Sequence, residues 1–337
     1  MKNIYDVTLN ELEEYFEKNG EKKFRAQQVY GAIYKKRLSS FDEIANISKE
    51  LRTKLNNDFS INKIKLLITQ KGENVNKYLF ELEDGNKIES VLMFHDYGTS
   101  ICVSSQVGCN MGCAFCESGR LKKVRNLLAY EIVQQILIIE EEIKKRITHV
   151  VVMGIGEPFD NYDNVLKFVK IINCNKGIDI GSRHITISTC GIIPGIEKFM
   201  KEEGQVNLAI SLHAPNDELR RKIMPIDKVY PLEDLMRVVK EYINKTNRRV
   251  TFEYVMLEGI NDSEKEAKQL ALLLQGINCY VNLIPYNETE NIGFKRSKQW
   301  KILTFYDILK SNKINTTIRK EFGGTVDAAC GQLRANN

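Results

Sequence analysis

The chain has 337 residues, of which 43% are hydrophobic and 28% are charged, so it can bury a large core and we expect a soluble α/β protein. No run approaches the roughly 18 uninterrupted apolar residues of a membrane span, and the first residues lack the apolar core of a signal peptide. We therefore expect a cytoplasmic protein without a membrane partner, in which eight cysteines are more suited to metal binding or catalysis than to structural disulfides.

The basic residues give a weak hint of an anionic partner. The net charge is +5, and short basic clusters begin at residues 22, 35, 122, 144, 220 and 295. For any single cluster we favour a solvated helix face or turn. The set as a whole is consistent with a surface that binds phosphate.

The first part of the chain reads as short amphipathic helices over residues 1–60, because apolar residues such as Leu9, Leu12 and Phe16 recur at helical spacing. Residues 61–98 follow as a β-hairpin extension. Its strand candidates, 78–82 and 88–93, flank Asp84-Gly85, which is a strong turn dipeptide.

Residues 99–337 alternate between strand and helix patterns. The strand candidates are 101–105, 150–153, 185–188, 208–212, 251–256, 281–284 and 316–319, and the helix candidates include 129–144, 162–172, 232–243 and 263–275. This alternation predicts a parallel sheet or barrel, whose chemistry would lie at the carboxyl ends of the strands.

Three cysteines, Cys109, Cys113 and Cys116, follow the first of these strands in a Cys-x-x-x-Cys-x-x-Cys pattern. Gly108 and Gly112 supply the backbone freedom that a loop wrapping a cluster needs, and Phe115 would supply an apolar wall. Three thiolates leave one iron of a four-iron cluster without a protein ligand, whereas a closed structural zinc site requires four ligands. Core cysteines or a partial zinc site are the alternatives.

This loop, with a Gly-rich turn ending in Glu157 after the second strand, resembles the radical S-adenosylmethionine (SAM) superfamily. The resemblance implies a [4Fe-4S] cluster whose open iron holds SAM, and reductive cleavage of SAM to a 5′-deoxyadenosyl radical.

The match narrows to the RlmN/Cfr family of RNA adenine methyltransferases. The chain is similar to that family in five motifs, in this order: Cys102-Val-Ser-Ser-Gln-Val-Gly-Cys109, Met153-Gly-Ile-Gly-Glu-Pro158, Ser211-Leu-His-Ala-Pro215, Asn282-Leu-Ile-Pro-Tyr-Asn287 and Ala328-Ala-Cys-Gly-Gln-Leu333. The resemblance implies a partial (β/α)6 radical SAM barrel over 99–337, preceded by an RNA-binding accessory domain over 1–60.

The family's chemistry assigns roles to three further residues. An adenine C2 carbon is too weak a nucleophile to attack SAM directly, so the family uses covalent catalysis. The resemblance implies ping-pong use of two SAM: the first methylates the cysteine that Cys330 matches, and the radical from the second abstracts hydrogen from that methyl group so that the carbon adds to the base. Cys102 matches the thiol that releases the product by forming a disulfide with the methyl carrier. Glu89 matches the proton acceptor, although strand alternation leaves solvent exposure as its alternative.

The remaining site residues are also implied by the resemblance. The positions that match SAM contacts are Gly156, Glu157, Ser188, Ser211, Leu212, His213 and Asn287. His213 taken alone would more often be a satisfied core histidine. We read Cys174, Cys190 and Cys279 as structural.

Two reactions share this scaffold. RlmN-type members methylate C2 of adenosine 2503 in 23S rRNA and of adenosine 37 in tRNAs, whereas Cfr-type members methylate C8 of the same rRNA nucleotide and confer antibiotic resistance. Pro158 after Gly-Glu and Val107 after Gln106 resemble the RlmN pattern, and the stretch 121–124 departs from its commoner form.

Two other classes of function stay open from the residues. One is a zinc-containing nucleic-acid-binding module, and the other is a radical SAM enzyme for a small molecule or peptide, which would leave Cys330 without a role. The family implies 23S rRNA and tRNA as partners and a flavodoxin or ferredoxin as electron donor, and we expect a monomer.

Overall fold

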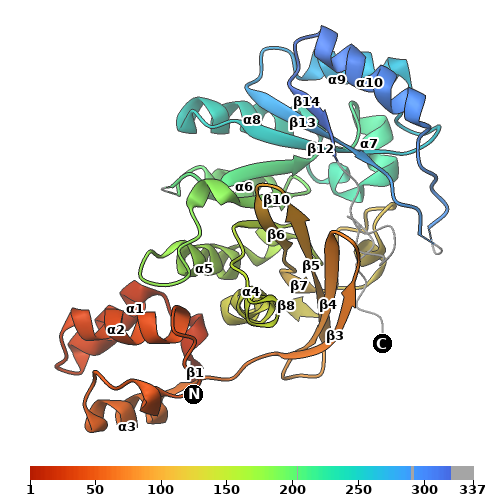
Figure 1. Ribbon diagram of the computed structural model, residues 1–337. Coiled ribbons are helices and arrows are strands. Elements are labelled where there is room, and N and C mark those ends of the chain that lie inside the picture. The colour runs from red at the N-terminus through yellow and green to blue at the C-terminus, as the bar shows by residue number, and fades with distance from the viewer. Residues whose placement is uncertain (203, 290–291, 320–337) are drawn as a thin grey trace.

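The computed structural model describes residues 1–202, 204–289 and 292–319, and its first part is helical. The elements are η1 (Ile4–Asp6), α1 (Leu9–Lys18), α2 (Lys23–Tyr34), η2 (Phe41–Glu43) and α3 (Lys49–Asp58). Thr8 and Glu11 form a capping box that starts α1. Two short parallel strands, β1 (Lys2–Asn3) and β2 (Phe59–Ser60), bring the two ends of this helical segment together (Figure 1).

A ten-stranded sheet follows this helical segment, with its strands in the order β14-β13-β12-β11-β10-β9-β6-β5-β4-β3. Its antiparallel part comprises β3 (Lys65–Lys71), β4 (Val75–Glu81), β5 (Lys87–His95) and β6 (Gly98–Cys102). Its parallel part continues from β6 through β9 (His149–Val152), β10 (Ile185–Thr189), β11 (Asn207–Ser211), β12 (Val250–Met256), β13 (Cys279–Pro285) and β14 (Thr316–Ile318). The hairpin extension is therefore continuous with the parallel sheet.

Helices connect the parallel strands. They are α4 (Ala129–Ile143), α5 (Tyr162–Asn173), α6 (Ile193–Phe199), α7 (Asp217–Ile223), α8 (Leu232–Thr246), α9 (Glu264–Leu273) and α10 (Gln299–Ser311). Shorter elements are β7 (Gln106–Val107), η3 (Glu117–Arg120), β8 (Arg125–Asn126), η4 (Pro158–Asn161), η5 (Ser182–His184) and η6 (Pro225–Lys228). From β9 onward, each parallel strand before β14 is followed by a helix and then by the next strand, which confirms the predicted α/β class.

The predicted elements differ from the structure at identifiable places. The first parallel strand was predicted at 101–105, but β6 ends at Cys102. Val103 N–H still donates to Val151 O on β9, whereas Ser104 N–H donates to Gln135 Oε1 on α4 and Ser105 N–H donates to Ile155 O in the loop after β9. Strand β3 and helices α6, α7 and α10 were not predicted. β3 is an edge strand that is largely exposed, so its sequence lacks the apolar alternation of a half-buried strand.

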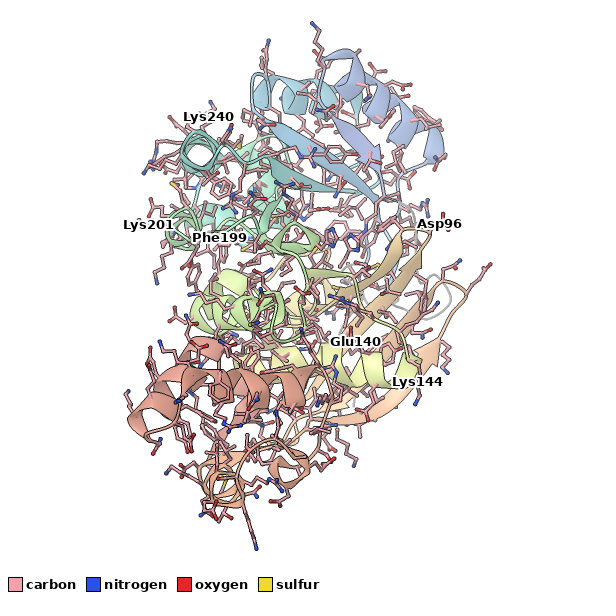
Figure 2. The ribbon with its side chains drawn as sticks, turned by 60° about the vertical axis from the view of Figure 1, so that its left-hand side comes forward. Asp96, Glu140, Lys144, Phe199, Lys201 and Lys240 are labelled. Atoms are coloured by element: carbon pink, nitrogen blue, oxygen red, sulfur yellow. The ribbon has the colours of Figure 1, made fainter. Side chains whose placement is uncertain are left out.

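One continuous apolar core joins the N-terminal helices to the sheet and its helices, running from Ile4 to Ile314. Polar contacts cross the same junction: the Arg37 guanidinium pairs with Glu140 on α4 (labelled in Figure 2), and Lys35 Nζ donates to Asn175 O over 2.8 Å. Among the described residues, no helix combines the length and the apolar character that crossing a bilayer would need.

Candidate active site

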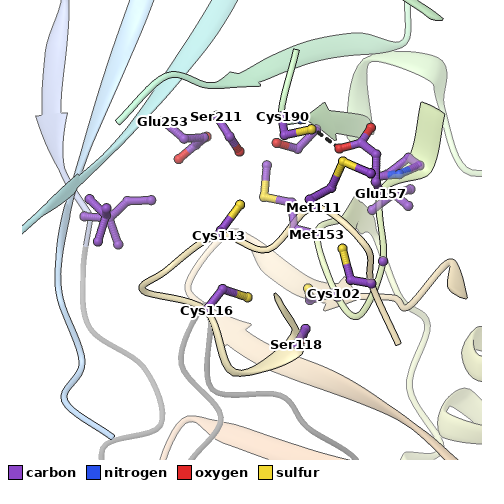
Figure 3. Close-up of a pocket in the computed structure, with 18 of the residues that line it drawn as sticks. Cys102, Met111, Cys113, Cys116, Ser118, Met153, Glu157, Cys190, Ser211 and Glu253 are labelled. Atoms are coloured by element: carbon purple, nitrogen blue, oxygen red, sulfur yellow. Dashed lines mark hydrogen bonds between the residues drawn. The ribbon is translucent and has the colours of Figure 1, made fainter. Parts of the chain in front are cut away.

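A cavity opens at the carboxyl ends of the parallel strands, where the motifs were expected to converge (Figure 3). Nine of the predicted site residues line it: Cys102, Cys109, Cys113, Cys116, Gly156, Glu157, Ser188, Ser211 and His213. They come from β6, the loop after it and the ends of three further strands. Residues far apart in the chain therefore meet at one place.

The loop that carries Cys109, Cys113 and Cys116 is shaped by glycine. Gly108 has a φ of +73°, and a Cβ there would lie 2.2 Å from Lys122 O, so only glycine fits. Cys109 N–H donates to Leu121 O over 2.9 Å, and Cys116 N–H donates to Cys113 O over 3.1 Å. These bonds help to hold the loop around the cavity.

The three thiols lie in apolar surroundings. Burial raises the pKa of the Cys109 thiol to about 12 and the pKa of the Cys113 thiol well above its usual value. Phe115 from the same loop lines the cavity as predicted. Sulfur donors suit iron–sulfur clusters or zinc rather than hard cations. Within the described ranges, no group of three or more His, Cys, Asp or Glu side chains is gathered tightly enough to hold one metal ion.

The turn Gly156-Glu157 follows β9 and is held by a buried glutamine. Gly156 has a φ of +112°, and Glu157 N–H donates to Gln106 Oε1 over 2.9 Å. The Glu157 carboxylate accepts N–H bonds from Phe159 (3.0 Å) and Cys190 (2.8 Å). Burial raises the pKa of Glu157, and these N–H bonds oppose the rise. The carboxylate is thus fixed in orientation at the cavity wall.

His213 follows β11 in a left-handed conformation, with a φ of +59°. Its Nδ1 accepts the Val255 N–H over 3.0 Å, so the ring proton lies on Nε2. The ring packs edge-on against Phe115 with centroids 4.8 Å apart. Burial, together with the nearby Arg220 charge, lowers the pKa of His213 to about 3, so the imidazole is neutral at working pH.

Three predicted residues lie elsewhere in the described structure. The side chain of Leu212 packs in the main apolar core, and Asn287 is half-buried beyond β13. Glu89 on β5 is buried rather than solvent-exposed, and its carboxylate pairs with Lys77 Nζ over 2.8 Å. None of these three lines the cavity. Cys330 lies outside the described residues.

Several cavity residues were not predicted. Cys190, read as structural, lines the cavity beside Glu157 (Figure 3). Glu253 and Arg319 line the cavity as well. The sequence did contain a signal for Glu253. Strands of a parallel sheet are buried and mostly apolar, so a carboxylate within the apolar strand 250–256 indicates a functional residue.

Arg220 had been grouped with a basic cluster but is fully buried. Its guanidinium donates to Cys190 O (2.6 Å), Ser211 O (3.3 Å) and Asp227 (3.1 Å). It ties together the ends of β10 and β11 and is not available to phosphate.

Comparison with protein families finds two matches in this chain. A model of the radical SAM superfamily matches residues 103–271, and a model of the N-terminal domain of ribosomal RNA large subunit methyltransferases matches residues 2–61. The first covers the three-cysteine loop and most parallel strands, and the second covers the N-terminal helices.

Similar full-length proteins carry the name probable dual-specificity RNA methyltransferase RlmN. The protein from Spiroplasma citri is 52% identical over 341 residues, covering 100% of this chain and 98% of its own length. The one from Enterococcus faecalis is 54% identical, covering 98% and 96%. The crystal structure of a radical SAM methyltransferase from Sphaerobacter thermophilus matches the fold with a TM-score of 0.93 at 40% identity, covering 100% of both chains.

Proposed function

The chain belongs to the RlmN family of radical SAM RNA methyltransferases, and from that membership we propose that it methylates C2 of adenine in RNA. The proposed substrates are the two adenosines named above, one in 23S rRNA and one in tRNAs, because the relatives are named as dual-specificity RNA methyltransferases. C8 methylation is not favoured, since the relatives compared carry the RlmN name.

The observation that carries the proposal is the meeting of the three-cysteine loop, the Gly156-Glu157 turn and Cys102 around one cavity. A [4Fe-4S] cluster bound there would supply an open iron and an electron for the cleavage of SAM. We assign Cys109, Cys113 and Cys116 as its ligands. Because burial raises the pKa of Cys109 and Cys113, these thiols would stay protonated without iron and give up their protons on binding it.

The chain's other residues would orient SAM. We propose that Gly156 and Glu157 bind its amino group and that Ser188, Ser211 and His213 bind other polar groups, since all five line the cavity. Leu212 and Asn287 stay in the proposal on the family resemblance alone. A neutral His213 can donate through Nε2 while Nδ1 is held by Val255.

The methyl relay would use three residues. Cys330 would receive the methyl group from one SAM. The 5′-deoxyadenosyl radical from a second SAM would take a hydrogen atom from that methyl group, and the resulting carbon radical would bond to C2. The adduct would return one electron to the cluster and lose its C2 proton to Glu89. The Cys102 thiolate would then attack the Cys330 sulfur, forming a disulfide as the carbon–sulfur bond breaks, and the released carbon would take up a proton to become the methyl group of the product. Glu89 keeps this role in the proposal on the family resemblance, and the structure shows its carboxylate buried and paired with Lys77.

Anaerobic reconstitution followed by mass mapping of RNA nucleosides tests the activity. We expect a brown protein with about four irons per chain, from the chemistry of a four-iron cluster, and 2-methyladenosine in both rRNA and tRNA. Replacing Cys330 by Ala should abolish RNA methylation. Finding 8-methyladenosine without its 2-isomer, or zinc in place of iron, would contradict the proposal.

The partners follow from the same membership. We propose RNA as substrate, a flavodoxin or ferredoxin as reductant and a monomeric enzyme. Titration with each reductant, followed by optical spectroscopy of the cluster, would identify the donor. Sedimentation would report the oligomeric state.

A further inference from the structure

Glu253 is a buried carboxylate in the cavity wall with one oxygen that has no hydrogen-bond partner in the described part of the chain. The residue is 4% exposed. Its Oε1 accepts the Asn282 side-chain N–H over 3.0 Å, while its Oε2 is buried and unbonded. Leaving a buried polar oxygen unpaired is unfavourable, and more so for a charged group, so a donor is expected to arrive with a ligand.

Strand register places Glu253 in a polar row. Ser211 on β11 pairs with Glu253 on β12, which pairs with Asn282 on β13. Directly paired residues of parallel strands present their side chains on the same face, so hydroxyl, carboxylate and amide stand side by side. Figure 3 shows Ser211 and Glu253 next to each other, across the opening from Cys102.

The surroundings of this row select the kind of ligand group. Val255 and Ile284 give apolar wall near it, so a hydrogen bond made there is little weakened by water. Burial raises the pKa of Glu253, and the Arg319 guanidinium opposes that rise. A ligand hydroxyl can donate to the carboxylate and accept from the Ser211 hydroxyl, which an ammonium group cannot do.

We propose that Glu253 is a positioning residue that accepts a hydrogen bond from a ribose hydroxyl of SAM through Oε2. A carboxylate that binds ribose hydroxyls is a recurrent solution in nucleotide-binding folds. Asn282 orients the carboxylate by holding Oε1. The inference rests on the proposed function, since it takes SAM as the ligand, and it assigns a contact from β12 to the nucleoside half of that ligand.

The test compares SAM with its 2′-deoxy and 3′-deoxy analogues in equilibrium dialysis on the anaerobically reconstituted enzyme. Glu253→Gln keeps the side-chain size but places an N–H donor where Oε2 accepts. We expect this variant to bind SAM about ten- to a hundred-fold more weakly than the wild type. The wild type should bind one of the two deoxy analogues about as weakly as Glu253→Gln binds SAM. The affinity for that analogue should not change further when Glu253 is replaced by Gln.

The matched control is Glu140→Gln, which changes a carboxylate on α4 that is bonded to Arg37 and Ile147 and lies outside the cavity. Its SAM affinity should equal that of the wild type. Melting temperatures of both variants report folding. If Glu253→Gln does not fold, the wild type with the two analogues still decides, because equal affinity for SAM and both analogues overturns the proposal.

Two further outcomes are informative. Unchanged SAM affinity with a raised KM for RNA would assign Glu253 to the target adenosine and overturn the SAM contact. Selective loss of SAM binding in a protein that methylates no RNA would support this inference while contradicting the proposed function. The two claims therefore fail separately.

Discussion

Individual side chains in the cavity show how burial sets their chemistry. His213 has both a left-handed backbone and a ring whose Nδ1 is occupied by Val255 N–H. The low dielectric of this position disfavours the imidazolium, so the folded protein holds a neutral ring. A neutral, oriented histidine is a hydrogen-bond donor of fixed geometry rather than a charge.

This protonation state predicts a pH dependence of stability. The pKa of His213 is about 3 in the folded protein and near 6.5 when unfolded, so below pH 6.5 the unfolded chain binds a proton that the folded chain does not. The free energy of unfolding should fall by up to about 1.4 kcal/mol per pH unit from this residue alone.

The variant His213→Asn should lose this contribution, because asparagine tolerates the left-handed backbone and does not titrate. Urea unfolding between pH about 6.5 and about 4.5 should give a smaller slope for the variant. Carboxylates titrate equally in both proteins and cancel in the difference. Identical slopes would show that His213 is protonated in the fold.

A second residue-scale prediction concerns Cys102, which packs with Val91 and Met93 at the cavity wall. If its thiol releases the product, Cys102→Ala should trap a covalent protein–RNA adduct, visible as a shifted band of labelled RNA on a denaturing gel. Cys279→Ala is the control, because that thiol is buried in the main core away from the cavity. Normal turnover by Cys102→Ala would remove it from the mechanism.

At the scale of elements, the turn after β9 depends on close packing against β7. A Cβ on Gly156 would lie 2.6 Å from Gln106 Cβ and 2.8 Å from Gln106 N, and the φ of +112° is itself unfavourable for other residues. Gln106 is held in turn by Asn126 and Asp160 at 2.8 and 2.9 Å. The turn therefore cannot shift without disturbing β7 and β8.

Gly156→Ala should accordingly cost about 1–3 kcal/mol of backbone strain and displace Glu157 from Gln106. We expect a lower melting temperature and SAM binding weakened at least about ten-fold, measured by equilibrium dialysis. Gly181→Ala is the matched control, since its φ is −60° and a Cβ there meets no atom within 4 Å. Equal SAM binding by Gly156→Ala and the wild type would contradict the role of the turn.

At the scale of the whole molecule, the N-terminal helices share the core of the parallel sheet. The apolar cluster is continuous between them, and Lys167 on α5 pairs with Asp6 and Glu11 over 3.5 and 3.0 Å. Residues 1–60 are proposed to bind RNA. They also cover apolar surface of the catalytic part of the chain.

Deleting residues 1–60 should therefore destabilise the remainder and expose apolar surface, with aggregation detected by light scattering. Adding the 1–60 peptide in trans should restore part of the lost solubility. A fragment of residues 61–337 that stays monomeric with an unchanged melting temperature would show that the two parts are independent.

Much of the fold and the cavity could be predicted from the sequence. Strand and helix periodicity predicted the positions of the parallel strands to within a few residues. The spacing of Cys109, Cys113 and Cys116 predicted a loop at the carboxyl end of the first of these strands. Local patterns carry this information because they reflect which face of each element is buried.

What only the tertiary structure decided is which distant residues meet. Local pattern did not predict that Glu253 and Arg319 face the cavity, that Glu89 is buried against Lys77, or that Arg220 is buried while joining two strand ends. The spacing of the cysteines and glycines is readable along the chain because a loop's geometry is local. How deeply a charged side chain is buried, and which groups it contacts, depends on the neighbouring strands. Both are therefore determined only when the sheet has formed.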